Sequence, residues 1–185
     1  MKFKKMIKRL SSQFITRYDV VYETEDGREK VYEMISRDKN ITTYEQLYDR
    51  KADAVVIIAH DAVNERILLN KEFRMAVGQW VYNFPAGLID PGEQPQESAK
   101  RELKEETGLD LIRITDVIGE SYSAIGFSNE KNICIVGVAE GTFAKSSSSF
   151  EEIKAGWYTK EEVRELLKTQ PFAARTQSYC YLWSR

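Results

Sequence analysis

Apolar and polar residues alternate on both sides of Asp26-Gly27, and this alternation predicts a β-hairpin over residues 17–36. The Asp-Gly pair is typical of a two-residue type I′ turn. A two-stranded ribbon is only marginally stable in water, so the hairpin is expected to pack on something else. The ten residues that open the chain, MKFKKMIKRL, are basic and lack the apolar region of a signal peptide. They are expected to form a solvated arm or a short helix rather than a membrane contact.

Beyond the hairpin, short apolar runs are separated by turn residues. Residues 52–59 (ADAVVIIA) form a continuous apolar run, which is typical of a central strand buried on both faces. Further strands are expected over residues 66–70, 80–84, 112–120, 132–140 and 156–159. Thr159 precedes Glu162 by three residues, a capping box that predicts the start of a helix. A closing helix is expected over residues 172–184, and residues 144–150 (AKSSSSF) are expected to form a flexible loop.

The stretch GLIDPGEQPQESAKRELKEETGL, from Gly87 to Leu109, predicts a helix between two glycine turns. Pro95 suits the first turn of a helix, where its missing N–H would have no partner in any case. Gly108 suits the left-handed residue that ends a helix. Ala99 and Leu103 form an apolar stripe at i, i+4, which is expected to face the core.

The same helix carries Glu102, Glu105 and Glu106 at i, i+3 and i+4, so the three carboxylates share one face. Carboxylates at this spacing repel one another, and a solvated helix has little reason to collect them. Binding of Mg²⁺ would explain the cluster, because Mg²⁺ takes oxygen ligands at about 2.1 Å from a few carboxylates and substrate phosphates. The alternative is a charged amphipathic helix between glycine turns, which explains the clustered acids less well.

Composition narrows the functional classes. The chain has 185 residues, enough for one well-buried domain and a small extension, and is 42% hydrophobic and 30% charged with a formal net charge of −2. No basic excess indicates a nucleic-acid partner, and no apolar run approaches the roughly 20 residues of a membrane span. Cys134 and Cys180 lie in apolar contexts, where buried thiols in a cytoplasmic protein are expected. His60 is the only histidine and is expected to be structural, which argues against a zinc site.

Every fixed position of the Gly87–Leu109 stretch matches the Nudix box, Gly-x5-Glu-x7-Arg-Glu-U-x-Glu-Glu-x-Gly-U, where U is a bulky aliphatic residue. The chain therefore resembles the Nudix hydrolases. Outside the box it resembles the ADP-ribose and nucleoside-diphosphate-sugar pyrophosphatases, through Phe73-Arg74, Trp80, Pro85-Ala86 and Gly126-Phe127-Ser128-x-Glu130. It departs from that subgroup at Ile125, where proline is usual, and at Asn83, where glutamate is frequent.

The resemblance implies an α/β (α+β) Nudix sandwich with a mixed sheet between helices, plus an N-terminal antiparallel β-hairpin. Residues 1–45 would form the arm and hairpin extension, and residues 46–185 the hydrolase domain. The activity implied is Mg²⁺-dependent cleavage of a nucleotide sugar, first of all ADP-ribose to AMP and ribose 5-phosphate, with Mn²⁺ as an alternative cation. Other readings stay open: another nucleotide sugar such as GDP-mannose, isomerisation of an isoprenyl diphosphate, or a non-catalytic nucleotide-sugar sensor.

Several site residues follow from the resemblance. The metal would be held by the Ala86 carbonyl and by three carboxylates, those of Glu102, Glu105 and Glu106. Arg101 is expected to pair with Glu93 and fix the loop against the helix, because arginine suits bidentate contact with a carboxylate. The general base would come from Glu151 or Glu152 in a loop beyond the box, with Glu105 as the alternative within it.

The nucleotide would be bound by Arg74 and Glu130, and an adenine ring also needs an aromatic or guanidinium face on which to stack. Tyr18 or Tyr22 of the hairpin could provide that face. The hairpin strands carry more apolar surface than a monomer is expected to leave exposed, at Tyr18, Val20, Tyr22, Val31 and Tyr32. Because two-fold dimers are the commonest closed assembly, we expect a homodimer in which the hairpin crosses to the partner and helps to wall its nucleotide pocket.

Overall fold

The structure, a computed structural model, describes residues 1–147 and 151–185 and divides into two compact units. The first unit comprises Met1–Asp53 and Glu120–Asn132, and the second comprises Ala54–Gly119 and Ile133–Arg185. Of the loop predicted at 144–150, residues 148–150 lie outside the described residues, and residues 144–147 form neither helix nor strand.

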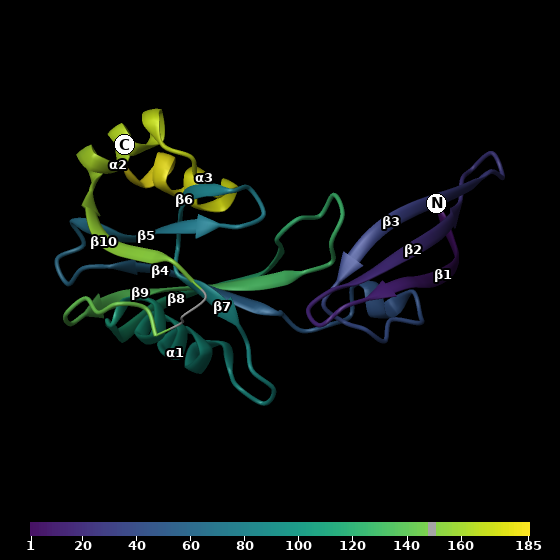
Figure 1. The fold of residues 1–185 in the computed structure, drawn as a ribbon, viewed down its shortest axis with the longest axis horizontal. Helices are drawn as coiled ribbons and strands as arrows, with labels where there is room; N and C mark the ends of the chain where they lie inside the picture. The colour runs from purple at the N-terminus through teal and green to yellow at the C-terminus, as the bar shows by residue number, and fades with distance from the viewer. Residues whose placement is uncertain (148–150) are drawn as a thin grey trace. The chain divides into compact units, whose positions relative to one another are not determined.

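The first unit holds an antiparallel sheet in the order β1-β2-β3, formed by β1 (Lys2–Ser11), β2 (Thr16–Glu23) and β3 (Glu29–Ser36) (Figure 1). Strands β2 and β3 confirm the predicted hairpin. The prediction of a solvated arm or short helix for the first ten residues is wrong. Lys4 donates to Glu23 at 2.7 Å and Arg9 donates to Asp19 at 2.7 Å, so the basic side chains of β1 pair with acids of β2.

A small core also lies within this unit. It contains Tyr18, Val20, Met34 and Ile41, and the side chains of Phe3, Met6, Tyr22 and Leu47 pack against it, the last from a short 3-10 helix, η1 (Glu45–Leu47). Tyr18 is fully buried and its hydroxyl donates to the Asp38 carbonyl at 2.9 Å. The expectation that the hairpin exposes Tyr18 and Val20 is therefore wrong, because a third strand and this core stabilise it within its own chain.

The hairpin turn is located as predicted, but its type differs. The Gly27 N–H donates to the Thr24 carbonyl at 3.0 Å, and the Thr24 N–H donates to the Arg28 carbonyl at 2.9 Å. A type I′ turn needs positive φ at Asp26 as well as at Gly27. Gly27 has φ of +79°, but the φ of Asp26 is not positive: in the described part of the chain, Asn64 is the one residue other than glycine with positive φ. The loop is therefore one residue longer, a type I turn closed by a left-handed glycine.

The second unit is built on a mixed sheet, seven-stranded in the described residues, with the order β10-β5-β4-β9-β8; β6 pairs with β5 and β7 with β4. The strands of this sheet are β4 (Ala54–His60), β5 (Arg66–Arg74), β6 (Gln79–Asn83), β7 (Ala86–Leu88), β8 (Asp110–Tyr122), β9 (Lys131–Glu140) and β10 (Ile153–Thr159). The end of β8 and the start of β9 belong to the first unit. All the strands predicted for this part of the chain are present, and β7 is an addition. Helix α1 (Pro95–Thr107) lies on one face, and α2 (Lys160–Thr169) and α3 (Ala174–Trp183) lie on the other (Figure 1).

The alternation of side chains along β4 fills a core on each face of this sheet. Val55, Ile57 and Ala59 pack with Ala99 and Leu103 of α1. The intervening residues pack with α2 and α3, in a cluster that includes Val56, Ile58, Val163 and Cys180. This confirms the prediction of a central strand buried on both faces. The same clusters show which way the side chains of β5 point. Leu68 packs in the cluster with α1, whereas Ile67 and Leu69 pack in the cluster with α2 and α3.

The helix boundaries follow the predicted signals. Pro95 is the first residue of α1, and Gly108 ends it with φ of +81°. Thr159 and Glu162 form the predicted capping box at the start of α2. His60 is buried and its Nε2 lies 3.2 Å from the Tyr179 hydroxyl, so it is structural as expected. Both cysteines are buried free thiols. In the described residues, no helix is long and apolar enough to cross a membrane.

Candidate active site

The face of β5 that points to α1 turns polar as the strand leaves the core. Leu68 packs in the α1 cluster, so the residues two, four and six positions later, Asn70, Glu72 and Arg74, lie on the same face. The Asn70 Nδ2 donates to Glu106 Oε2 at 2.7 Å, and Arg74 Nη1 donates to Glu72 Oε1 at 2.6 Å. The sequence identified Arg74 alone. It missed Asn70 and Glu72: a strand extended to residue 74 would have put both on the face of Leu68, but their approach to the acidic helix also depends on the register of the sheet.

Glu106 lies at the centre of this acidic cluster and is buried. Burial raises its pKa well above the ordinary value, and the negative charges of Glu72, Glu102 and Glu151 raise the pKa further. A hydrogen bond from the backbone of Ala86 opposes this shift. In the described part of the chain, no basic side chain pairs with Glu106. Its negative charge is therefore disfavoured in the protein alone and would be stabilised by a cation.

Glu102 lies against the backbone of β7. A Cβ atom added to Gly87 would lie 1.9 Å from the Glu102 carboxyl carbon, so only glycine permits this approach. Arg101 Nη1 donates to Glu102 Oε1 at 2.7 Å and lowers its pKa, yet burial outweighs this effect and the pKa of Glu102 is raised overall. The first glycine of the box thus has a steric role, since it makes room for a carboxylate of the helix.

Arg101 ties the loop before α1 to the helix. Its Nε and Nη2 donate to the two oxygens of Glu93 at 3.1 and 2.9 Å, and Nη2 also donates to the Leu88 carbonyl at 3.0 Å. The bidentate pairing expected from the sequence is present. Arg101 and Ser98 together lower the pKa of Glu93 to about 2. Glu105 is half-exposed, and its Oε2 lies 3.4 Å from Arg101 Nη1.

The Ala86 carbonyl is directed away from β4. The Ile57 N–H donates to the Pro85 carbonyl at 2.8 Å, and Val56 pairs with Ala86 in the next register position. Ala86 is therefore at a non-hydrogen-bonded position of the β4–β7 pair, where its N–H and carbonyl point to the other side of β7. The hydrogen bond between its backbone and Glu106 agrees with this direction.

The register of β5 with the start of β10 distinguishes Glu151 from Glu152. Ile153 pairs with Glu72, and the Phe73 N–H donates to the Glu152 carbonyl at 3.0 Å. Continued alternation places Glu151 on the α1 face of the sheet and Glu152 on the opposite face. The charge of Glu151 also raises the pKa values of Glu102 and Glu106. The geometry thus brings Glu151 to the carboxylates.

The remaining predicted binding residues are divided between the two units. Arg74 belongs to the second unit, and Tyr22 and Glu130 belong to the first. Glu130 forms an ion pair with Arg37, and the Tyr22 ring lies 6.2 Å from Phe3 and 6.4 Å from Tyr44, centroid to centroid. Tyr18 is fully buried, so the expectation that it offers a stacking face is wrong.

The donor set of the second unit suits a hard cation. In residues 1–147 and 151–185, no three histidine, cysteine, aspartate or glutamate side chains are already arranged as a metal site. The carboxylates around Glu106 are nevertheless oxygen donors, which Mg²⁺ and Mn²⁺ prefer. Within the described residues, Asn70 Oδ1 is also buried beside Glu106 without a hydrogen-bond partner. The residues present therefore fit a divalent cation.

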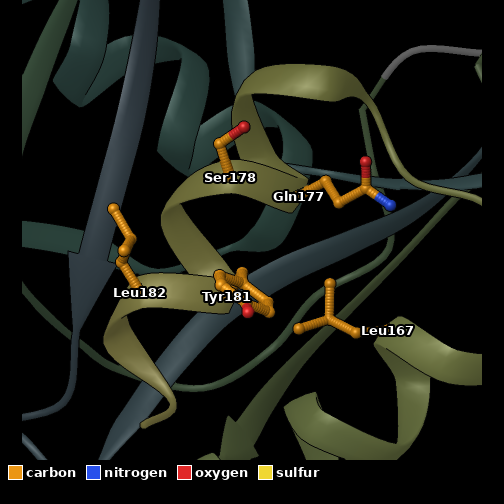
Figure 2. A pocket seen from close by; sticks show the side chains of 5 residues that line it. All are labelled: Leu167, Gln177, Ser178, Tyr181 and Leu182. Carbon is orange, nitrogen blue, oxygen red and sulfur yellow. The ribbon is translucent and has the colours of Figure 1, made fainter.

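Two hollows in the second unit differ in chemistry. One, of about 410 Å³, is lined by both Glu151 and Glu152 and also by Trp80, Lys145 and Lys154. The other, of about 430 Å³, lies between α2 and α3 and is lined by Leu167, Gln177, Ser178, Tyr181 and Leu182 (Figure 2). Among the described residues that line this second hollow there is no carboxylate, so it differs in charge from the surroundings of Glu106.

Comparison with known proteins agrees with this geometry. The NUDIX domain model matches residues 50–179. The chain is 34% identical over 92 residues to the ADP compounds hydrolase NudE of Escherichia coli, covering 50% of the chain and 48% of the relative. It is 33% identical over 119 residues to an ADP-ribose pyrophosphatase of Saccharomyces cerevisiae, covering 64% and 49%. The chain thus spans about half the length of these curated relatives.

A solved structure described as an ADP compounds hydrolase superposes with a TM-score of 0.73 at 20% identity, covering 99% of this chain and 92% of that one. At this identity the likeness establishes the fold, an α+β arrangement with a mixed sheet. The family match extends over most of the chain and includes the complete box, whose glycine, arginine and glutamates meet around the β7–α1 junction. This protein is a member of the Nudix family.

Proposed function

We propose that this protein is a Mg²⁺-dependent hydrolase that cleaves the pyrophosphate of a nucleoside diphosphate sugar, with ADP-ribose as the leading substrate. Water would add across the P–O–P linkage of ADP-ribose and give AMP and ribose 5-phosphate. One observation carries the proposal: Glu106 is a buried carboxylate among further carboxylates, with no basic partner in the described residues. The relatives that are named for ADP-ribose and ADP compounds support the substrate class.

In this proposal Glu102 and Glu106 are the principal metal ligands, and Glu105 and the Ala86 carbonyl complete the set. A bound Mg²⁺ or Mn²⁺ would neutralise the phosphate charge and lower the pKa of a water molecule. Arg101 holds the Glu93 loop against α1 and so keeps the ligand helix in place.

Glu151 is the proposed general base, because it lies on the same face of the sheet as the carboxylate cluster. Glu152, on the opposite face, and Glu105, which lies next to Arg101, are less well placed to take a proton from the attacking water.

Arg74 is the proposed contact to the substrate's phosphates, since it follows Asn70 and Glu72 on the α1 face of β5. The hollow beside Glu151 would take the sugar phosphate, for which Lys145 offers positive charge. Glu130 and Tyr22 are retained as proposed contacts to the nucleoside. Tyr22 is partly exposed within its aromatic cluster, as a stacking residue needs to be.

The substrate is tested with a panel of ADP-ribose, ADP-glucose, UDP-glucose and GDP-mannose. We expect ADP-ribose to have the highest kcat/KM in the presence of Mg²⁺. An added phosphatase releases inorganic phosphate from the cleaved products but not from the intact diesters, and malachite green measures it. A higher kcat/KM for GDP-mannose would make GDP-mannose the proposed substrate and would leave the proposed reaction unchanged. No turnover of any member with Mg²⁺ or Mn²⁺ would contradict the hydrolase itself.

We further propose that residues 1–45 act as a dimerisation extension of a catalytic domain at 46–185 in a cytoplasmic homodimer. The exposed apolar side chains of the first unit support this, namely Leu10, Phe14, Val31 and Tyr32. Tyr18 and Val20 are buried and do not contribute to this surface.

The full chain is therefore expected to have the mass of a dimer in light scattering at micromolar concentration. Replacing Leu10 and Phe14 together by lysine should shift it towards the monomer, because both side chains are exposed and their change leaves the core intact. As a matched control, Val63 is equally exposed but lies in the second unit, and Val63→Lys should leave the mass unchanged. A monomeric mass for the unmodified chain would reject the dimer.

A further inference from the structure

Asn70 is a buried amide in the middle of the acidic cluster. The residue is 1% exposed, and its Nδ2 donates to Glu106 Oε2 at 2.7 Å. It lies on the central part of β5, where the neighbouring strands hold the backbone on both sides through the pairs Asn70–Ala155 and Asn70–Asn83. Its position is therefore fixed by the sheet, while Glu106 comes from the helix.

The second amide atom of Asn70 is not used by the protein. Asn70 Oδ1 is buried and has no hydrogen-bond partner in the described residues. A buried polar atom without a partner costs free energy, and such atoms are rare in folded proteins. The structure thus carries an unpaired acceptor next to a buried carboxylate, in a place where a leucine would fill the same volume without that cost.

We propose that Asn70 is a positioning residue of the metal site: its Nδ2 orients the Glu106 carboxylate towards the cation, and its Oδ1 accepts a hydrogen bond from the hydrated ion. This inference rests on the proposed function, because it assigns Asn70 a part in the same metal site. Carboxylates that bind metals are commonly held by hydrogen bonds from a neighbouring group, and Mg²⁺ keeps several of its waters when bound. The amide of asparagine offers both a donor and an acceptor.

The neutrality of Asn70 distinguishes it from Arg101. Arg101 donates to Glu93, Glu102 and Glu105 and partly neutralises them. A second arginine or a lysine at position 70 would pair with Glu106 and compete with the cation. An amide holds the carboxylate in one orientation and leaves its charge for the ion. Arginine thus serves the carboxylates that need neutralising, and the amide of Asn70 serves Glu106, which has no basic partner in the described residues.

The test measures binding of Mn²⁺ to the full-length protein without substrate, from the signal of free Mn²⁺ in electron paramagnetic resonance. Asn70→Leu removes the donor and the acceptor at similar volume. Loss of such a hydrogen-bonding group typically weakens metal affinity about 10- to 100-fold, and we expect this range for Asn70→Leu. Asn70→Ala serves as a second variant if the leucine does not fit, and the same range is expected.

Asn129→Leu is the matched control. Asn129 is also buried, has an unpartnered Oδ1 in the described residues, and donates through Nδ2 at 3.3 Å to a backbone carbonyl, that of Leu47. It belongs to the first unit, so Mn²⁺ affinity should not change. Turnover of Asn70→Leu should also recover as Mn²⁺ is raised, which a merely structural defect would not allow.

The outcomes separate this inference from the function on which it rests. If the unmodified protein binds no Mn²⁺, the proposed metal-dependent function fails. If it binds Mn²⁺ and both Asn70 variants bind within twofold of it, the role of Asn70 is rejected while the function stands. An equal loss in Asn129→Leu would also reject the role, because the effect would then belong to any buried amide.

Discussion

Removal of divalent cations with EDTA is expected to abolish turnover of the nucleotide sugar, and addition of excess Mg²⁺ or Mn²⁺ is expected to restore it. The reason is the charge at the β7–α1 junction. Glu106 is buried, and Glu72, Glu102 and Glu151 lie near enough to raise its pKa. A negatively charged pyrophosphate would not approach these carboxylates unless a cation neutralised both.

Phosphate release from ADP-ribose in metal-free buffer, before and after addition of each cation, measures this effect. Zn²⁺ provides a comparison, since a site made of oxygen donors is expected to favour the harder Mg²⁺ and Mn²⁺. The folded state should be followed by circular dichroism in the same samples, so that loss of activity is not confused with unfolding. Full turnover in EDTA would show that the reaction does not use the carboxylate cluster.

The part of the site that lies on α1 could be predicted from sequence because its signals are local. Pro95, Gly108 and the three glutamates depend on helix geometry, in which side chains at i, i+3 and i+4 always meet. The pairing of Arg101 with Glu93 was also within reach, since both belong to one loop and helix. The strands of the second unit followed from continuous apolar runs, which indicate burial on both faces.

The part of the site that lies on β5 could not be predicted in the same way. Whether Asn70 and Glu72 reach Glu106 depends on the register between β5 and its neighbours, and a shift of one residue would turn both to the other face. The sequence likewise does not distinguish Glu151 from Glu152 as the general base, because their faces follow from the pairing of Ile153 with Glu72. The first strand was missed because irregularities in its pairing with β2, between Phe3 and Lys5 and between Lys8 and Leu10, interrupt the alternation of apolar and polar residues on which strand prediction relies.

Glu106→Gln is expected to lower turnover by at least about 100-fold, because it removes a charged ligand, whereas loss of a weaker neighbouring group already costs 10- to 100-fold. The glutamine keeps the shape of the side chain and can still accept a hydrogen bond from Asn70. Initial rates with ADP-ribose at saturating Mg²⁺ measure the loss. Glu140→Gln, an exposed glutamate at the end of β9, should retain normal rates. Near-normal turnover of Glu106→Gln would place the cation elsewhere.

The same substitution should stabilise the metal-free protein at neutral pH. The pKa of Glu106 is raised from its ordinary value of 4.5, so between 4.5 and the raised value the folded state binds more protons than the unfolded state. The free energy of unfolding therefore falls as pH rises through that window, and glutamine avoids this loss. We expect a higher Tm for Glu106→Gln than for the unmodified protein at pH 7 in EDTA, and similar values at pH 4. Saturating Mg²⁺ should raise the Tm of the unmodified protein but not the Tm of Glu106→Gln. A lower Tm for Glu106→Gln in EDTA at pH 7 would mean that the protein itself compensates the buried charge.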